Sequence, residues 1–150
     1  MSAREVAILI AEDDNDHAEL IMRNLKRAGL LNRMIRLTDG QQTLDYLTGN
    51  TAEGPPSGAL LLLLDLRMPK VDGFEVLKQV KESPRLRRMP VIVLTTTDDP
   101  EDVQRCHDLG CNSFITKPVM TDRFMEAVTT LGLFIKVVEV PHLRIYERAE

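Results

Sequence analysis

Apolar runs alternate with amphipathic stretches along the chain. Three runs, Val6 to Ala11, Leu60 to Leu64 and Val91 to Leu94, are apolar at every position. Strands covered by helices on both faces of a sheet have this composition. Two shorter and more mixed runs, Met34 to Thr38 and Ser113 to Thr116, predict the outer strands of the same sheet. The alternation therefore predicts an α/β fold in which βαβ units surround a parallel sheet.

Capping residues and glycines mark the helices between these strands. Asp99 followed by Pro100 is a typical helix start, because Asp accepts from free N–H groups and Pro needs none at the first helical position. Glycine often follows the end of a helix. The predicted helices begin at or near Asn15, Gly40, Asp72, Asp99 and Thr121, and Asn15 and Asp72 are expected to cap theirs. Two of these helices end at Gly29 and Gly110. The predicted order is (βα)5 with a C-terminal tail.

The ends of the predicted strands carry polar residues. Ligands of open parallel sheets bind at the carboxyl ends of the strands, so residues directly after each strand are the candidates for a site. Carboxylates, hydroxyls and one lysine are therefore expected at one edge of the sheet. They are Glu12, Asp13 and Asp14 after the first strand, Asp65 after the third, Thr95 and Thr96 after the fourth, and Lys117 after the fifth.

The clustered carboxylates predict a cation. Carboxylates close together raise one another's pKa unless a cation lies among them. Mg²⁺ suits the set because it prefers oxygen ligands, keeps several waters and uses one or two carboxylates together with a phosphate oxygen. Asp13 and Asp65 are expected as direct ligands and Glu12 through water. Lys117 and the Thr95 hydroxyl could neutralise charge on a transferring phosphoryl group.

Each of these residues taken alone has an ordinary interpretation. Asp after a strand often caps a helix, Thr there often packs, and a single Lys is usually solvated. Their joint placement after four strands favours a functional site.

Four segments give the chain a clear resemblance to the receiver domains of two-component response regulators. They are Ile8–Asp14 (ILIAEDD), Leu63–Gly73 (LLDLRMPKVDG), Val91–Thr96 (VIVLTT) and Phe114–Pro118 (FITKP). The resemblance implies a receiver domain over residues 1–138 with an extension at 139–150. It also implies a doubly wound, flavodoxin-like fold whose parallel five-stranded sheet has the order 2-1-3-4-5.

The same resemblance implies roles for individual residues. Asp65 is expected to be the phosphoacceptor, and the backbone carbonyl of Arg67 is expected to join Glu12, Asp13 and Asp65 as a Mg²⁺ ligand. Phe114 takes the position of the switching aromatic residue, where Tyr is common, and so lacks a hydroxyl there. The phosphate-binding and switching residues are expected to be Thr95, Thr96 and Lys117, with a cis peptide bond before Pro118.

As a function, the resemblance implies a stand-alone switch that accepts a phosphoryl group from a histidine kinase and controls partner binding. The amino-acid sequence of residues 113–118 is similar to that of small regulators paired with phytochrome-type kinases. An alternative is a phosphatase or dehalogenase that uses Asp65 as a nucleophile, but such enzymes usually need a cap domain or a second Asp where this chain has Arg67. A degenerate receiver would lack an acid, the acceptor or the lysine, and all are present.

The composition of the chain limits the kinds of partner and the cellular location that can be expected. The chain has 150 residues, a net charge of −4 and a hydrophobic fraction of 43%. An acidic domain has no general attraction for nucleic acid, whose phosphates favour basic surfaces. No apolar run approaches the roughly 20 residues of a transmembrane helix and no signal peptide is evident, so a cytoplasmic location is expected. The spacing of Cys106 and Cys111 suits neither a zinc knuckle nor a redox pair, which predicts free thiols.

The C-terminal region is more apolar than one core requires. The segment from Leu133 to Tyr146 contains Phe134, Ile135 and several valines. It is expected to drive homodimerisation, as a helical extension or as a strand, with packing against its own domain as the alternative.

Overall fold

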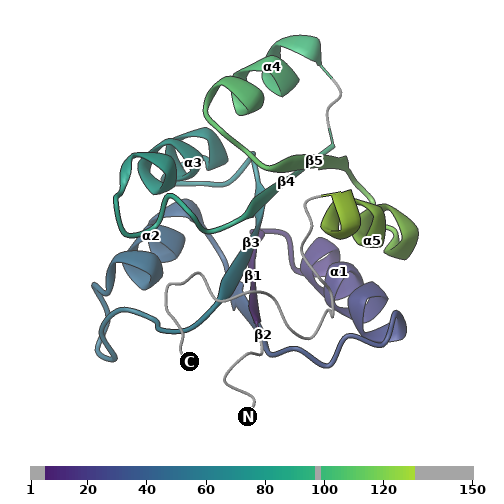
Figure 1. Cartoon of the computed structure of the whole chain (residues 1–150), viewed down its shortest axis with the longest axis horizontal. Helices are drawn as coiled ribbons and strands as arrows, with labels where there is room; N and C mark the ends of the chain where they lie inside the picture. Colours follow the sequence, from purple (N-terminus) through teal and green to yellow (C-terminus); the bar gives the residue numbers. More distant parts are fainter. Residues whose placement is uncertain (1–5, 97–98, 131–150) are drawn as a thin grey trace.

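The structure is a computed structural model that describes residues 6–96 and 99–130. These residues form one parallel sheet of order β2-β1-β3-β4-β5 with helices on both faces (Figure 1), which confirms the predicted fold. Among them, no helix combines the length and the apolar composition needed to span a bilayer. The elements in chain order are β1 Ala7–Ala11, α1 Asn15–Arg27, β2 Met34–Leu37, α2 Gly40–Thr48, β3 Leu60–Asp65, α3 Gly73–Glu82, β4 Val91–Thr95, α4 Pro100–Asp108, β5 Ser113–Thr116 and α5 Thr121–Thr130.

The three central strands are the three continuous apolar runs of the sequence. β3 is buried at all six positions and β4 at all five, because helices cover both faces of the sheet. The two more mixed runs form the edge strands β2 and β5, as predicted. β3 includes Asp65 and β4 includes Thr95, so both strands run one residue further than the apolar pattern. The sheet itself therefore holds the Asp65 carboxyl and the Thr95 hydroxyl.

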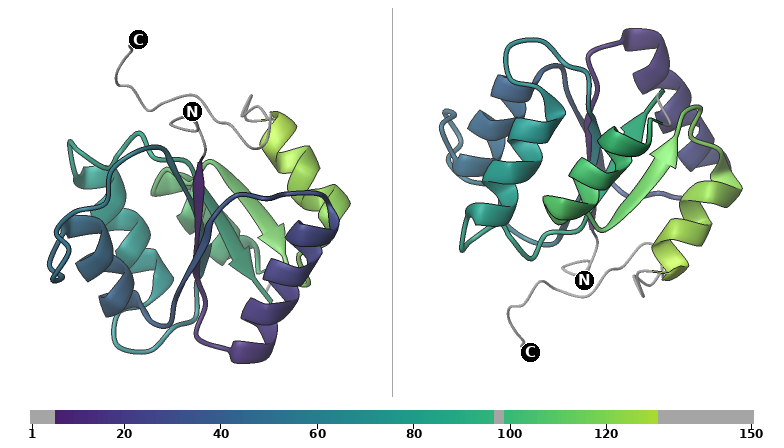
Figure 2. Two further views of the ribbon diagram at one scale, coloured as in Figure 1. Left: turned by 90° about the horizontal axis from the view of Figure 1, so that it is seen from below. Right: turned by 90° about the horizontal axis from the view of Figure 1, so that it is seen from above.

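The helices divide into two layers. α1 and α5 cover one face, and α2 and α3 cover the other, with α4 beside α3 near β4 and β5 (Figures 1 and 2). One core cluster joins Leu47 of α2 and Leu77 of α3 to the sheet, and the other joins Leu25 of α1 and Phe124 of α5. α4 has a single buried residue, Cys106. It is thus the helix least embedded in the core.

Helix capping agrees with the sequence in two places and differs in one. The carboxylates of Asp72 and Asp99 accept from the backbone N–H groups of their helices, as predicted. The expected cap of the first helix, Asn15, was wrong by one position. Asp14 caps it instead, because its carboxylate reaches the N–H groups of Asp16 and His17, whereas the Asn15 side chain accepts from Arg36.

Gly73 lets the start of α3 approach the end of β3. A Cβ at this position would lie 2.3 Å from the backbone oxygen of Asp65 and 2.6 Å from the Cα of Leu66. Only a residue without a side chain fits against this backbone. The Gly73 N–H also donates to the Leu66 carbonyl at 2.9 Å, which fixes the loop that follows Asp65.

Cys106 and Cys111 are free thiols, in agreement with their spacing. Burial raises the pKa of the Cys106 thiol to about 12. The boundary between residues 138 and 139 and the segment from 133 to 146 lie outside the described residues. Homodimerisation through that segment therefore stays a prediction.

Candidate functional site

The carboxyl ends of the strands bring the predicted site residues to one edge of the sheet. Glu12 follows β1, Asp65 ends β3 and Thr95 ends β4, and all three are buried. Asp13 is exposed beside them. Glu12, Asp13 and Asp65 each supply a carboxylate oxygen, and these oxygens lie within 4.8 Å of one another. The three acids identified from the sequence therefore form a single cluster.

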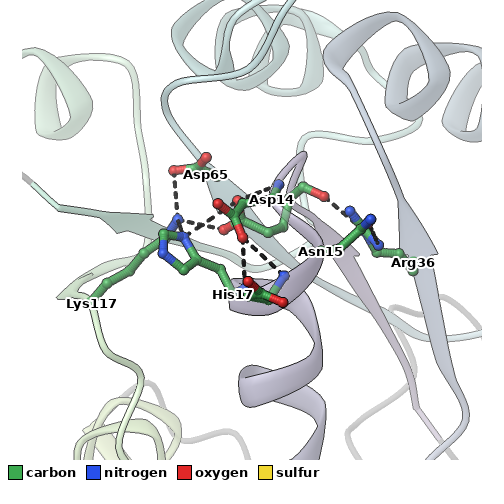
Figure 3. A network of polar contacts seen from close by, with 8 residues as sticks. Asp14, Asn15, His17, Arg36, Asp65 and Lys117 are labelled. Carbon is green, nitrogen blue, oxygen red and sulfur yellow. Dashed lines mark hydrogen bonds and ion pairs between the residues drawn. The ribbon is translucent and has the colours of Figure 1, made fainter.

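Lys117 enters this cluster from the end of β5. Its Nζ lies 2.5 Å from Glu12 Oε1 and 3.3 Å from Asp65 Oδ1, and the Lys117 side chain is only 8% exposed. Figure 3 shows the lysine reaching along the sheet edge toward Asp65. The backbone N–H of Lys117 donates to the Thr95 carbonyl at 2.7 Å, so the ends of β4 and β5 are joined. One ammonium group thus partly offsets two buried carboxylates.

The groups around Asp65 act in opposite directions on the pKa of its carboxyl. The pKa of the Asp65 carboxyl is raised to about 6, mainly by burial and also by the nearby Glu12 carboxylate. The Lys117 ammonium and the Arg67 backbone N–H act in the opposite direction on this pKa. A cation placed among the acids would favour the ionised form.

The donor set fits a hard divalent cation. Glu12 Oε2 accepts from the Asp14 N–H at 3.1 Å, whereas the buried Oε1 has no hydrogen bond of proper geometry and is balanced only by the ammonium charge of Lys117. Together with Asp13 and Asp65, the cluster offers only oxygen ligands, one of them incompletely satisfied. Mg²⁺ and Mn²⁺ favour such sets.

The remaining predicted residues lie around the cluster. The Arg67 guanidinium is exposed and pairs with Asp102 of α4 at 3.0 Å, and no contact of its backbone carbonyl tests the predicted metal ligation. Thr96 is exposed. Phe114 of β5 is half-buried and packs against the core. The peptide bond between Lys117 and Pro118 is cis, as the resemblance implied.

Sequence reasoning missed two residues of this edge. His17 Nδ1 lies 3.1 Å from Lys117 Nζ (Figure 3), although the sequence suggested only a helical position for this histidine. No spacing signal was available, because Asp13 precedes the helix that carries His17 and Lys117 lies one hundred residues further along the chain. Arg36 of β2 donates through Nε to the Glu12 carbonyl at 2.8 Å. It thereby fixes the turn between β1 and α1.

A cavity of about 230 Å³ lies next to Lys117 and His17. It is formed by one side of α1, by the segment that joins β5 to α5 and by Thr96 after β4. Its lining residues are His17, Leu20, Ile21, Thr96, Lys117, Pro118 and Val119.

Comparison with known proteins places this site in a family. Residues 8–129 match the response regulator receiver domain. The probable methanogenesis regulatory protein FilR2 of Methanothrix harundinacea is 48% identical over 121 residues, covering 81% of this chain and 77% of that protein. The response regulator Rcp1 of Synechocystis is 38% identical over 112 residues, covering 73% and 75% of the two chains.

Solved structures agree with the sequence matches. The bacteriophytochrome response regulator AtBRR superposes with a TM-score of 0.77 at 39% identity, covering 88% of this chain and 95% of that one. The Mn²⁺-bound form of Rcp1 superposes with a TM-score of 0.73 at 34% identity, covering 91% and 99%.

The chain belongs to the response regulator receiver domain family. It is homologous to single-domain response regulators of two-component signal transduction, and its near structural neighbours include regulators associated with phytochromes.

Proposed function

We propose that this protein is a phosphorylation switch in which Asp65 accepts a phosphoryl group from a histidine kinase. One observation carries the proposal. The Asp65 carboxylate is buried at the end of a central strand, inside a cluster of three acids, with Oδ1 3.3 Å from the Lys117 ammonium. A rigid strand end holds the acceptor, and a positive charge lies where negative charge would develop.

The proposed transfer follows from these groups. The ionised Asp65 carboxylate attacks phosphorus, the bond from phosphorus to the kinase imidazole breaks, and an acyl phosphate forms on Asp65. Protein groups have little covalent chemistry to perform in such a transfer, so positioning and charge neutralisation dominate. Lys117 would neutralise one phosphoryl oxygen, and the Thr95 hydroxyl is suited to bind another.

We assign Mg²⁺ as the cofactor. Glu12, Asp13 and Asp65 would hold it, with the Arg67 backbone carbonyl as a further ligand. When bound, the ion would shield the acids from one another and neutralise phosphoryl charge. The Mn²⁺-bound form of Rcp1 supports a divalent ion in such a site, and an all-oxygen donor set accepts either metal.

The proposed output is binding rather than catalysis on an external substrate. Arg67 stands where a phosphatase or dehalogenase would carry its second acid, and its guanidinium pairs with Asp102 of α4. Repositioning of Thr95 and Phe114 after phosphorylation would alter the surface built by β4, β5 and their helices. α4, with one buried residue, is the helix whose packing resists such a change least.

We propose a phytochrome-type histidine kinase as the phosphodonor. The likeness to the bacteriophytochrome response regulator AtBRR and to Rcp1 supports this choice. The cavity beside Lys117 offers an apolar surface, with Leu20 and Ile21 on one side, on which a donor's side chains could pack close to the acceptor.

Homodimerisation through residues 133–146 is a further part of the proposal and rests on the apolar sequence there. A chain that ends at Gly132 is expected to be monomeric at concentrations at which the full chain is dimeric. Light scattering measures both masses, and a folded truncated chain that stays dimeric would refute this part.

A metal-removal experiment tests the proposed cofactor. Incubation with acetyl phosphate and Mg²⁺ is expected to place one phosphoryl group on each chain. EDTA is expected to reduce the initial rate at least tenfold, because the three acids then repel both one another and the incoming phosphoryl group. Excess Mg²⁺ should restore the rate. Equal uptake with and without EDTA would contradict the assignment.

A further inference from the structure

We propose that His17 is a positioning residue for phosphoryl transfer to Asp65. Its imidazole Nδ1 accepts a hydrogen bond from the Lys117 ammonium and so helps to hold that ammonium beside the phosphoacceptor. The proposal rests on the proposed function and adds a residue to it.

The contacts of Lys117 carry the argument. Its Nζ has three partners, Glu12 Oε1 at 2.5 Å, His17 Nδ1 at 3.1 Å and Asp65 Oδ1 at 3.3 Å. An ammonium group has protons and no lone pair, so it can only donate a hydrogen bond. The imidazole nitrogen that faces Lys117 must therefore be the acceptor, and the neutral ring carries its proton on Nε2.

The first turn of α1 fixes the imidazole in this place. The backbone N–H of His17 donates to Asp14 Oδ1 at 3.0 Å, which anchors the residue at the capped helix start. His17 Nδ1 lies 3.9 Å from Glu12 Oε2, which is too long for a hydrogen bond. The polar contact of Nδ1 is thus with Lys117. Figure 3 shows the ring beside the end of the lysine side chain.

The two shorter contacts of the Lys117 ammonium hold it beside Asp65. Glu12 and His17 hold the shorter contacts of the ammonium, and the remaining and longest contact is with Asp65. When Asp65 takes up a phosphoryl group, the ammonium already lies close to where a phosphoryl oxygen arrives. Lysine has a flexible stem with many rotamers, so a second anchor besides Glu12 reduces the ordering that transfer requires.

Two substitutions of matched size test the role of the acceptor atom. Asn and Leu have nearly the same shape, and the Asn side-chain oxygen can occupy roughly the position of Nδ1. With acetyl phosphate and Mg²⁺, His17→Leu is expected to lower the initial rate of phosphorylation about three- to tenfold, the usual range for the loss of one intramolecular hydrogen bond. His17→Asn should recover most of the rate. His107→Leu, on the exposed side of α4, serves as the control and should match the wild type.

A double-mutant cycle separates this role from a merely structural one. In a Lys117→Ala background, His17→Leu should cause no further loss, because the group that it positions is gone. If Lys117→Ala falls below detection, the same cycle can be measured as beryllofluoride affinity in the presence of Mg²⁺. A wild-type rate for His17→Leu, a rate for His17→Asn as low as that for His17→Leu, or equal losses in both backgrounds would overturn the inference. If Lys117→Ala itself phosphorylates normally, the proposed function fails instead.

Discussion

The Asp65→Asn variant is expected to take up phosphoryl groups from acetyl phosphate at least about a hundredfold more slowly than the wild type, because an amide oxygen is a far weaker nucleophile than a carboxylate. Asp65 is the last residue of the central strand β3, whereas Glu12, the other acid in contact with the Lys117 ammonium, follows the end of β1. The measurement is the initial rate of phosphoryl incorporation in Mg²⁺, followed on phosphate-affinity gels.

The matched control is Asp108→Asn, which makes the same chemical change at an exposed position on α4. This variant should keep the wild-type rate. Near-normal uptake by Asp65→Asn, with unfolding behaviour like that of the wild type, would remove Asp65 from the proposal.

The same variant is expected to be more stable than the wild type at neutral pH in EDTA. The folded state raises the pKa of Asp65 from 3.8 to about 6, so it binds a proton more tightly than the unfolded state does. This stabilising contribution is complete below about pH 4 and is lost as the pH rises through about 6. The difference between the two pKa values corresponds to about 3 kcal/mol, and Asn avoids that loss.

Urea unfolding followed by circular dichroism can measure this effect, since the chain has no Trp. In EDTA, the stability of Asp65→Asn relative to the wild type should grow between pH 4 and pH 7.5 by up to about 3 kcal/mol. Mg²⁺ should narrow the gap at pH 7.5, because it binds the folded wild-type site. A gap that does not change with pH, or that reverses, would show that the buried carboxyl is not destabilising when ionised.

Much of the fold follows from the sequence for physical reasons. Helices on both faces bury the central strands, so their hydrophobic runs, such as Leu60 to Leu64, are continuous and easily recognised. The polar residues directly after those runs, Asp65 among them, then lie together because parallel strands end at the same edge. The candidate site could therefore be predicted before its geometry was known.

The contacts between side chains could not be predicted in the same way. Asp14 and Asn15 are both good capping residues. In the structure Asp14 caps α1, whereas the Asn15 side chain accepts from Arg36 on a neighbouring strand, a contact that the sequence does not reveal. His17 contacts Lys117 one hundred residues away in the chain, and no spacing pattern signals such a pair. The apolar segment from 133 to 146 could be covered by a second copy or by its own domain, and hydrophobicity alone does not choose between them.

The position of the phosphoryl group tests the central claim most directly. Borohydride reduces an acyl phosphate on aspartate to homoserine, and mass spectrometry of peptides then identifies the modified residue. After reaction with acetyl phosphate and Mg²⁺, the modification should fall on Asp65 in the peptide that spans β3. A modification on Asp13 or on any other residue, with Asp65 unmodified, would contradict the account.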